Sequence, residues 1–304
     1  MYLWPAILTK THTEMIVFPQ AKINIGLFVT RKREDGYHIL QTLFYPIGWH
    51  DALEIVPNQQ IGHQVEWRQT GITVDCDPEQ NLCVKAYRML QERYPWMPSI
   101  EMHLEKQIPF GAGLGGGSSD GAHALLALRE VLTLPISDTD LEAMAARMGA
   151  DCAFFCRCGN RLNTAGNGGR MQAQYCEGIG YELRPHNLSL RGRYIVVVKP
   201  PFGVSTREAY SGVQPRIPDT PLDVLLQQPI ETWRDCVHND FEDSVFRLHP
   251  ELADVKQCLY DHGAVYASMS GSGSAMFGIF NEEQQGCSQW FGEGYQVKQD
   301  KALV

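Results

Sequence analysis

The sequence is short of basic residues. Lysine and arginine together number 26 in 304 residues, against 35 aspartates and glutamates, so the formal net charge is -9. Binding of nucleic acid depends largely on lysines and arginines that neutralise phosphates. The charge balance therefore argues against a nucleic-acid partner, and an anionic ligand would have to be held by groups gathered at one place.

Long apolar runs are also missing from the start of the chain. Residues 1–14 hold one short apolar patch with no basic stretch before it, and Lys10 interrupts the chain directly after this patch. A secretory signal or a membrane-spanning helix needs a longer uninterrupted apolar segment. We therefore expect neither of these, and we expect the protein in the cytoplasm.

Paired C-x-x-C motifs are absent, although the sequence contains nine cysteines. An odd number of cysteines scattered along a long chain is typical of reduced thiols and not of a disulfide framework. Cys152, Cys156 and Cys158 could form part of a metal cluster with Cys176, but their spacing does not match that of paired zinc ligands. We favour buried or incidental thiols.

Apolar periodicity predicts an α+β protein in two lobes. Strands are expected over residues 15–32 with a break at Pro19, over 51–57, 99–109 and 193–201, and on both sides of a glycine turn in 264–280. Asp35-Gly36 predicts a hairpin turn, and the strands over 51–57 and 99–109 are expected to be antiparallel. Helices are expected over 81–94, 119–132 (ended by Pro135), 137–149 (capped by Ser137), 206–213 and 244–263, with an exposed loop over 158–174.

The segment "PFGAGLGGGSSDGA", residues 109–122, contains six glycines. Glycine loses conformational entropy when it is ordered and adds nothing to a core, so such a cluster needs a local reason. A tight turn between strand and helix would need only one or two glycines. We infer that something approaches this backbone closely.

Two familiar nucleotide motifs fit this segment poorly. Gly111, Gly113 and Gly116 satisfy G-x-G-x-x-G, but the strand before them is amphipathic and the acidic residue expected near position 130 falls inside a helix. A P-loop would carry a lysine where Gly117 and Ser118 stand. Small residues can nevertheless direct successive amides at an anion, and the following helix adds its positive end and the serine hydroxyls.

At this point the sequence resembles a known family. Residues 109–122 are similar to the phosphate loop of the GHMP kinases, and further motifs agree in family order between residues 15 and 280, namely "PQAKINIGL", "REDGYHILQTLF", "GADCAFF", "NDFE" and "SGSGSAMFG". The long G-L-G-G-G-S-S form resembles the members that act on a small-molecule substrate, a cytidine diphosphate derivative of methylerythritol. The resemblance implies ATP and Mg²⁺ as cofactors.

The resemblance also implies a fold. An N-terminal domain over residues 1–192, with residues 1–14 as an extra segment, would contain a mixed sheet with helices like domain 2 of ribosomal protein S5. A C-terminal domain over residues 193–304 would form a ferredoxin-like lobe. The active site would lie in the cleft between them.

The family's site residues can be assigned to positions of this sequence. Asp151 corresponds to the base that accepts the hydroxyl proton, and Lys22 to the lysine beside it, whose charge would keep the carboxylate ionised. The ATP-binding residues would be Pro109, Phe110, Gly111, Ala112, Gly113, Leu114, Gly115, Gly116, Gly117, Ser118 and Ser119. The substrate-binding residues would be Asn24, Tyr37, His38, Thr206, Tyr210, Gly271 and Ser272. The sequence does not identify the metal ligands.

Tyr37 and His38 are the residues that indicate cytidine. In the family pattern the tyrosine stacks on the base and the histidine reads its edge, and Thr206 and Tyr210 close over it. Asn24 lies on the same strand face as Lys22 and would orient the acceptor end of the substrate. Gly271 and Ser272 would face the substrate phosphates.

Three departures from the family pattern leave alternatives open: Ala153 stands where the family has proline, residues 1–14 are an extra segment, and further residues are inserted near Asp151. About a dozen extra residues lie between Cys156 and Gln174. Surface insertions cost little closure entropy, so activity can persist. The alternatives to the cytidine-specific kinase are a GHMP kinase with another alcohol acceptor and a nucleotide-binding homologue silenced by the insertion.

Overall fold

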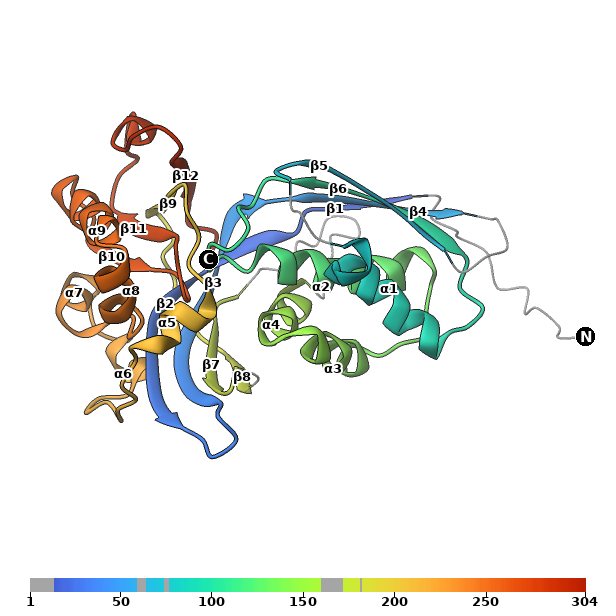
Figure 1. Ribbon diagram of the computed structural model, residues 1–304, viewed down its shortest axis with the longest axis horizontal. Helices are drawn as coiled ribbons and strands as arrows, with labels where there is room; N and C mark the ends of the chain where they lie inside the picture. Colours follow the sequence, from blue (N-terminus) through green and yellow to red (C-terminus); the bar gives the residue numbers. More distant parts are fainter. Residues whose placement is uncertain (1–13, 59–63, 74–76, 160–171, 181) are drawn as a thin grey trace, which may run out of the picture.

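The protein has two lobes joined along a long β-hairpin (Figure 1). The computed structural model describes residues 14–58, 64–73, 77–159, 172–180 and 182–304. In the N-terminal lobe helices cover one face of a sheet, and in the C-terminal lobe a second group of helices packs on another sheet. The predicted α+β class and two-lobe arrangement are confirmed.

A four-stranded sheet packs against the helices of the N-terminal lobe. Its strands, in spatial order, are β1 (Met15–Val17), β4 (Ala52–Asn58), β6 (Ser99–Lys106) and β5 (Val65–Gly71). β4 runs antiparallel to β6, as predicted, and β5 runs parallel to β6. Met102 and Leu104 are buried while Glu101, His103 and Glu105 are partly exposed, because alternate side chains point to opposite faces. Strand β5 is not among the predicted strands.

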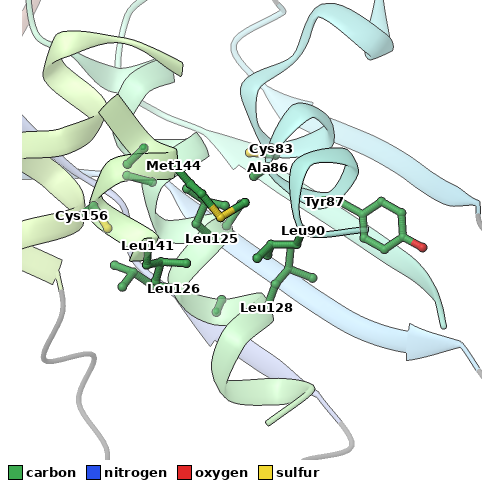
Figure 2. Packing of buried hydrophobic residues seen from close by; sticks show 14 of the residues in the cluster. Cys83, Ala86, Tyr87, Leu90, Leu125, Leu126, Leu128, Leu141, Met144 and Cys156 are labelled. Atoms are coloured by element: carbon green, nitrogen blue, oxygen red, sulfur yellow. The ribbon is translucent and has the colours of Figure 1, made fainter. Parts of the chain in front are cut away.

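Helix α2 is the centre of this lobe. The helices are η1 (Pro78–Gln80), α1 (Leu82–Arg93), α2 (Gly116–Val131), α3 (Asp138–Met148) and α4 (Ala150–Gly159). Leu125, Leu126 and Leu128 of α2 pack with Leu90 of α1 and Leu141 of α3 (Figure 2). Each fully buried leucine contributes about 1.5–3 kcal/mol of transfer free energy. This packing holds α2, and therefore its first turn, firmly in place.

The predicted helices of this lobe are confirmed with two corrections and one omission. Ser137 is the N-cap of α3 and Gly149 its C-cap, as expected. Helix α2 starts at Gly116, earlier than predicted, and ends at Val131, so Pro135 is not what stops it. Helix α4 is the omission, because "GADCAFF" carries a family motif but no clear helical period.

A second sheet contains the long hairpin. Its spatial order is β2 (Gln20–Lys32), β3 (His38–His50), β7 (Gln174–Gly178) and β8 (Glu182–Pro185). The break at Pro19 and the turn at Asp35-Gly36 are confirmed. The predicted loop over 158–174 is wrong at its ends, because Cys158 belongs to α4 and Gln174 begins β7. Residues 160–171, like residues 1–13, lie outside the described residues.

The C-terminal lobe is an antiparallel sheet in the order β10 (Tyr266–Met269), β11 (Met276–Phe280), β9 (Tyr194–Lys199) and β12 (Gln296–Lys301). Helices connect β9 to β10, and β10 pairs directly with β11, as in a ferredoxin-like lobe. Between β11 and β12 the helical element is the short η3 (Cys287–Gln289). Strand β12 is not among the predicted strands.

The helices of this lobe pack against its sheet. They are α5 (Thr206–Ser211), α6 (Leu222–Leu225), η2 (Ile230–Thr232), α7 (Trp233–Cys236), α8 (Glu242–Leu248) and α9 (Glu251–Asp261). The single helix predicted over 244–263 is wrong. Pro250 disfavours helical backbone at His249, which takes φ -133° and ψ 73°, so the chain breaks between α8 and α9.

The two lobes share a hydrophobic core at β2. Ile23 and Ile25 of β2 belong to the same buried cluster as Val197 of β9 and Phe277 of β11. Leu27 of β2 also exchanges backbone hydrogen bonds with residues 238 and 240 of the C-terminal lobe, at 2.9 and 2.8 Å. Residues of β2 therefore lie where the lobes meet. None of the helices in the described part of the chain has the length and apolar character to cross a membrane.

Candidate active site

The glycine loop joins the end of β6 to the first turn of α2. Three glycines of the loop have positive φ angles, which residues other than glycine rarely adopt: Gly111 (+63°), Gly113 (+72°) and Gly115 (+70°). Gly115 is the N-cap of α2 and offers no side chain to the free amides of the first turn. Those amides and the positive end of the helix can therefore receive an anion.

Three of the loop glycines are required by the protein itself. A Cβ at Gly113 would lie 2.0 Å from the carbonyl oxygen of Ser270, and one at Gly115 would lie 2.9 Å from Phe155. A Cβ at Gly116 would lie 2.8 Å from Ile108. By contrast, Gly117 has no atom within 4 Å of that position and is exposed. The expected close approach therefore comes largely from neighbouring chain, and Gly117 is an open position where a ligand can come near.

The C-terminal lobe touches the loop directly. The hydroxyl of Ser270 donates to the carbonyl oxygen of Gly113 at 2.9 Å. The backbone amide of Ala275 donates to the carbonyl oxygen of Ala112 at 3.1 Å. The second glycine turn, residues 270–274, thus packs on the first. Gly271 lies here, and a Cβ on it would be 3.2 Å from Oδ1 of Asn24.

Lys22 brings three segments together. Its ammonium donates to the carbonyl oxygen of Gly113 at 2.9 Å and to Oδ1 of Asn24 at 2.5 Å, and it lies 3.5 Å from Oδ2 of Asp151. The Lys22 side chain is 4% exposed and that of Asp151 is 30% exposed. The predicted lysine and aspartate therefore meet beside the glycine loop, with the carboxylate accessible to a ligand.

Asp151 is positioned by the start of α4. Helix α3 ends at Met148 with Gly149 as its C-cap, α4 begins at Ala150, and Asp151 lies in the first turn of α4. A carboxylate is favoured there by the positive end of the helix and by the neighbouring ammonium. The arrangement places a partly exposed carboxylate next to a loop that can receive an anion.

Asn24 is held in a buried polar chain. Its amide group donates to Oγ1 of Thr42 at 2.9 Å, and its backbone amide donates to Oγ of Ser270 at 3.2 Å. With Oδ1 accepting from Lys22, both the oxygen and the nitrogen of the side-chain amide are bonded within the protein. These contacts orient the lysine, and the expected contact of Asn24 with substrate stays a prediction.

The residues assigned to cytidine gather only in part. The rings of His38 and Tyr210 stack with centroids 4.6 Å apart and planes 29° apart. Tyr37 follows the hairpin turn and is 63% exposed, and Thr206 is exposed at the start of α5. Burial and the charge of Lys32 lower the pKa of His38, so its neutral ring has one donor and one acceptor nitrogen.

The "NDFE" motif, which received no role from the sequence, supports the second glycine turn. Asn239 donates to the carbonyl oxygens of Met269 and Gly271, both at 2.8 Å. Oε1 of Glu242 accepts a hydrogen bond from the backbone amide of Met269 at 2.8 Å. The motif's place in family order was the one signal that these residues matter, because their partners lie about thirty positions away.

The four cysteines considered as a metal cluster are free thiols. Burial raises the pKa of all four to about 12. These are Cys152, Cys156, Cys158 and Cys176. Within the described ranges no three His, Cys, Asp or Glu side chains are placed to hold an ion together.

Comparison with known proteins identifies the family. Residues 81–159 match the model of the GHMP kinase N-terminal domain, and residues 222–287 match that of the C-terminal domain. A 4-diphosphocytidyl-2-C-methyl-D-erythritol kinase of Bacteroides fragilis is 45% identical over 89% of this chain and 94% of its own length. One from Bacteroides thetaiotaomicron is 46% identical over 88% and 93%. The chain belongs to the GHMP kinases.

Solved structures agree with this assignment. The crystal structure of a 4-(cytidine 5'-diphospho)-2C-methyl-D-erythritol kinase is 34% identical, with a TM-score of 0.70 over 87% of this kinase and 90% of that chain. A homoserine kinase from Cytophaga hutchinsonii is 19% identical, with a TM-score of 0.59, and shares the fold over 99% of this chain and 97% of its own. GHMP kinases are ATP-dependent, so ATP is the phosphoryl donor.

Two alanine substitutions separate the structural glycines of this kinase from the open one. Gly113→Ala should lower the free energy of unfolding by at least about 2 kcal/mol, because of its left-handed φ and the contact with Ser270. Gly117→Ala should leave stability within about 1 kcal/mol but raise the KM for ATP, because its methyl group points into the open space of the loop. Denaturant unfolding and steady-state kinetics measure both, and an equal loss of stability in the two variants would contradict this division.

Proposed function

We propose that this kinase transfers the γ-phosphoryl group of ATP to the 2-hydroxyl of 4-diphosphocytidyl-2-C-methyl-D-erythritol, in the non-mevalonate route to isoprenoid precursors. The observation that carries the proposal is the ion pair of Lys22 and Asp151 beside the glycine loop, 3.5 Å apart. We take the substrate from the names of the relatives, which match this chain over most of its length. Free thiols at every described cysteine support a cytoplasmic location.

Positioning and electrostatics would supply most of the acceleration. The amides at the start of α2 would bind the phosphates of ATP, and the partly exposed Ser118 adds a hydroxyl donor. Ser119, expected to do the same, is fully buried with its hydroxyl 3.3 Å from Nδ1 of His123, so its side chain is turned into the protein. The carboxylate of Asp151 accepts the proton of the substrate hydroxyl as that oxygen attacks the γ-phosphorus and the bond to the bridging oxygen of ADP breaks. Lys22 lies between this carboxylate and the loop, so its charge also offsets negative charge on the transferring group.

The cytidine end would bind near the turn of the β2–β3 hairpin. Tyr37 is exposed and free to stack on a base, and the neutral ring of His38 can hydrogen-bond to the edge of cytosine. Tyr210 supplies a second ring and Thr206 a hydroxyl from α5. Gly271 and its neighbour Ser272, next to the glycine loop, would face the substrate diphosphate.

Mg²⁺ would enter with the nucleotide. Magnesium in such sites usually keeps several waters and binds through substrate phosphates with one or two carboxylates. The hydroxyl of Ser118, which contacts the side chain of Cys152, is an oxygen donor of the right kind at the loop, and the carboxylate of Asp151 is kept for its proposed role as base. The ion would neutralise phosphate charge there.

Replacing the proposed base tests this mechanism. In Asp151→Asn, kcat should fall by about 10²- to 10⁴-fold because the amide cannot accept the proton, while the affinity for ATP stays within about threefold. ADP formation with the cytidine substrate, with and without Mg²⁺, measures turnover, and calorimetry measures binding.

Asp140→Asn is the matched control for this substitution. Asp140 also lies in the first turn of a helix and pairs with a cation, Arg93, at 2.8 Å, but on the outer surface of α3. Its turnover should equal that of the unmodified kinase. If Asp151→Asn retains full turnover, the base is another group, and if the unmodified protein forms no ADP, the activity itself is wrongly assigned.

Selectivity for cytidine distinguishes this kinase from one with another alcohol acceptor. CDP should raise the melting temperature more than UDP at equal concentration, because a ligand bound only by the folded state stabilises it in proportion to the logarithm of its affinity. His38→Ala should remove most of the difference. Equal shifts with CDP and UDP in the unmodified protein would contradict the roles given to Tyr37, His38 and Tyr210.

A further inference from the structure

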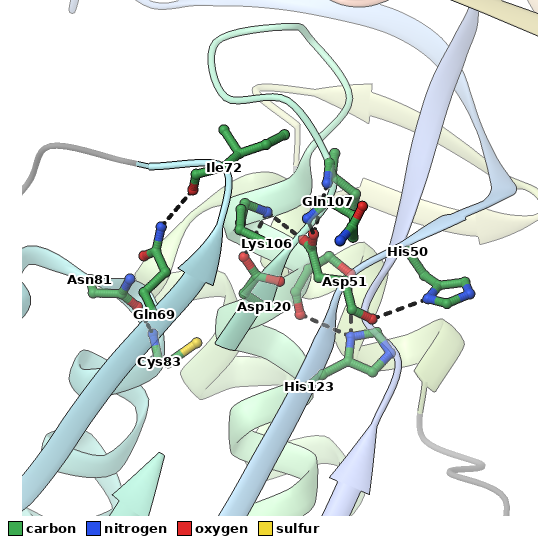
Figure 3. A network of polar contacts seen from close by, with 12 residues as sticks. His50, Asp51, Gln69, Ile72, Asn81, Cys83, Lys106, Gln107, Asp120 and His123 are labelled. Atoms are coloured by element: carbon green, nitrogen blue, oxygen red, sulfur yellow. Dashed lines mark hydrogen bonds and ion pairs between the residues drawn. The ribbon is translucent and has the colours of Figure 1, made fainter. Parts of the chain in front are cut away.

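Three ionisable side chains lie buried beneath the glycine loop, and none of them belongs to the site described above (Figure 3). Lys106 ends β6, Asp51 lies between β3 and β4, and Asp120 lies in α2. The ammonium of Lys106 forms an ion pair with Asp51 and lies 3.0 Å from Oδ2 of Asp120. All three side chains are at most 4% exposed.

Asp51 ties this cluster to the start of the loop. Its Oδ1 accepts the backbone amides of Gln107 and Ile108, at 2.5 and 2.8 Å, immediately before Pro109. Its own amide donates to the carbonyl oxygen of Pro19 at 2.9 Å. The residues that enter the loop are therefore fixed to the connection between β1 and β2.

Asp120 and Gly116 tie the same cluster to the end of the loop. A Cβ at Gly116 would lie 3.0 Å from the ammonium of Lys106, so glycine at this position lets the ammonium pass close under the first turn of α2. One turn further on, Asp120 accepts from that ammonium. One lysine thus connects the backbone before the loop to the helix after it.

Burying these three ionisable groups has an unfavourable desolvation free energy. Burial raises the pKa of Asp120 well above its ordinary value, and the charge of Asp51 adds to this although Lys106 opposes it. Among the described residues, Oδ1 of Asp120 has no hydrogen-bond partner. Buried ionic groups are often no more stabilising than apolar ones of the same volume, so stability alone does not explain two carboxylates here.

We propose that Asp51, Lys106 and Asp120 are positioning residues that hold the two ends of the glycine loop at a fixed separation, so that its amides are aligned before ATP binds. The proposal rests on the proposed function of this loop. A glycine-rich segment has much conformational entropy to lose, and a loop already ordered in the free protein loses less when the phosphates arrive.

Asp120→Ala tests the proposal. It removes the contact between Lys106 and α2 but leaves Asp51 and Lys106 as a neutral pair, so the protein should fold. The dissociation constant and the KM for ATP should rise about 5- to 20-fold, within the range of one charged hydrogen bond, while kcat changes less than about twofold. Calorimetry with a non-hydrolysable ATP analogue and steady-state kinetics measure these quantities.

Two further variants separate positioning from general destabilisation. Asp120→Asn keeps an oxygen that can accept from Lys106 and should bind ATP within about threefold of the unmodified kinase. Arg129 lies in the last turn of α2, at the end remote from the loop, and pairs with Glu130 at 2.9 Å and with Asp138 of α3 at 2.5 Å; Arg129→Met removes this cation. It should lower the melting temperature and leave the affinity for ATP unchanged.

The affinities of these variants for ATP decide whether the proposal holds. Unchanged ATP affinity in Asp120→Ala, or an equal loss in Arg129→Met, would overturn the positioning role. Loss of affinity in Asp120→Ala with recovery in Asp120→Asn supports it. Because calorimetry needs no turnover, the positioning role is tested even if the unmodified protein phosphorylates another alcohol or none.

Discussion

The structure of the site depends on one buried ammonium group. Lys22 can lie in the interior only if its charge is paired and its hydrogens are accepted, and its partners come from three separate segments: Asn24 of the same strand, Gly113 of the glycine loop and Asp151 of α4. Satisfying this one charge brings the hairpin, the loop and the proposed base to a common point. It also leaves the carboxylate partly exposed, as a group that exchanges a proton with substrate must be.

The glycine loop is shaped first by the protein and only then by its ligand. Gly113 and Gly116 make room for Ser270 and for Lys106, so the loop is packed between the second glycine turn on one side and a buried ionic cluster on the other. Gly117 alone of these three faces open space. A phosphate site built in this way combines a rigid backbone with a small accessible surface, which is the condition for binding by preorganised amides.

Much of this could be predicted from the sequence, because periodicity and capping act locally. The helix capped by Ser137 and the hairpin turn at Asp35-Gly36 are examples, and family order alone linked Lys22 to Asp151. The ionic cluster could not be predicted, since Lys106 meets its partners only after distant elements have packed. The start of α2 could not be predicted either, because its first turn contains Gly116 and Gly117, and glycine is a poor helix former.

A crystal structure with a non-hydrolysable ATP analogue and the cytidine substrate tests the central claim most directly. We expect the β- and γ-phosphates within hydrogen-bonding distance of the amides of residues 115–118, and the substrate hydroxyl between the γ-phosphorus and the carboxylate of Asp151. Phosphates bound away from these amides, or a hydroxyl on the side of the nucleotide remote from Asp151 and Lys22, would contradict the account.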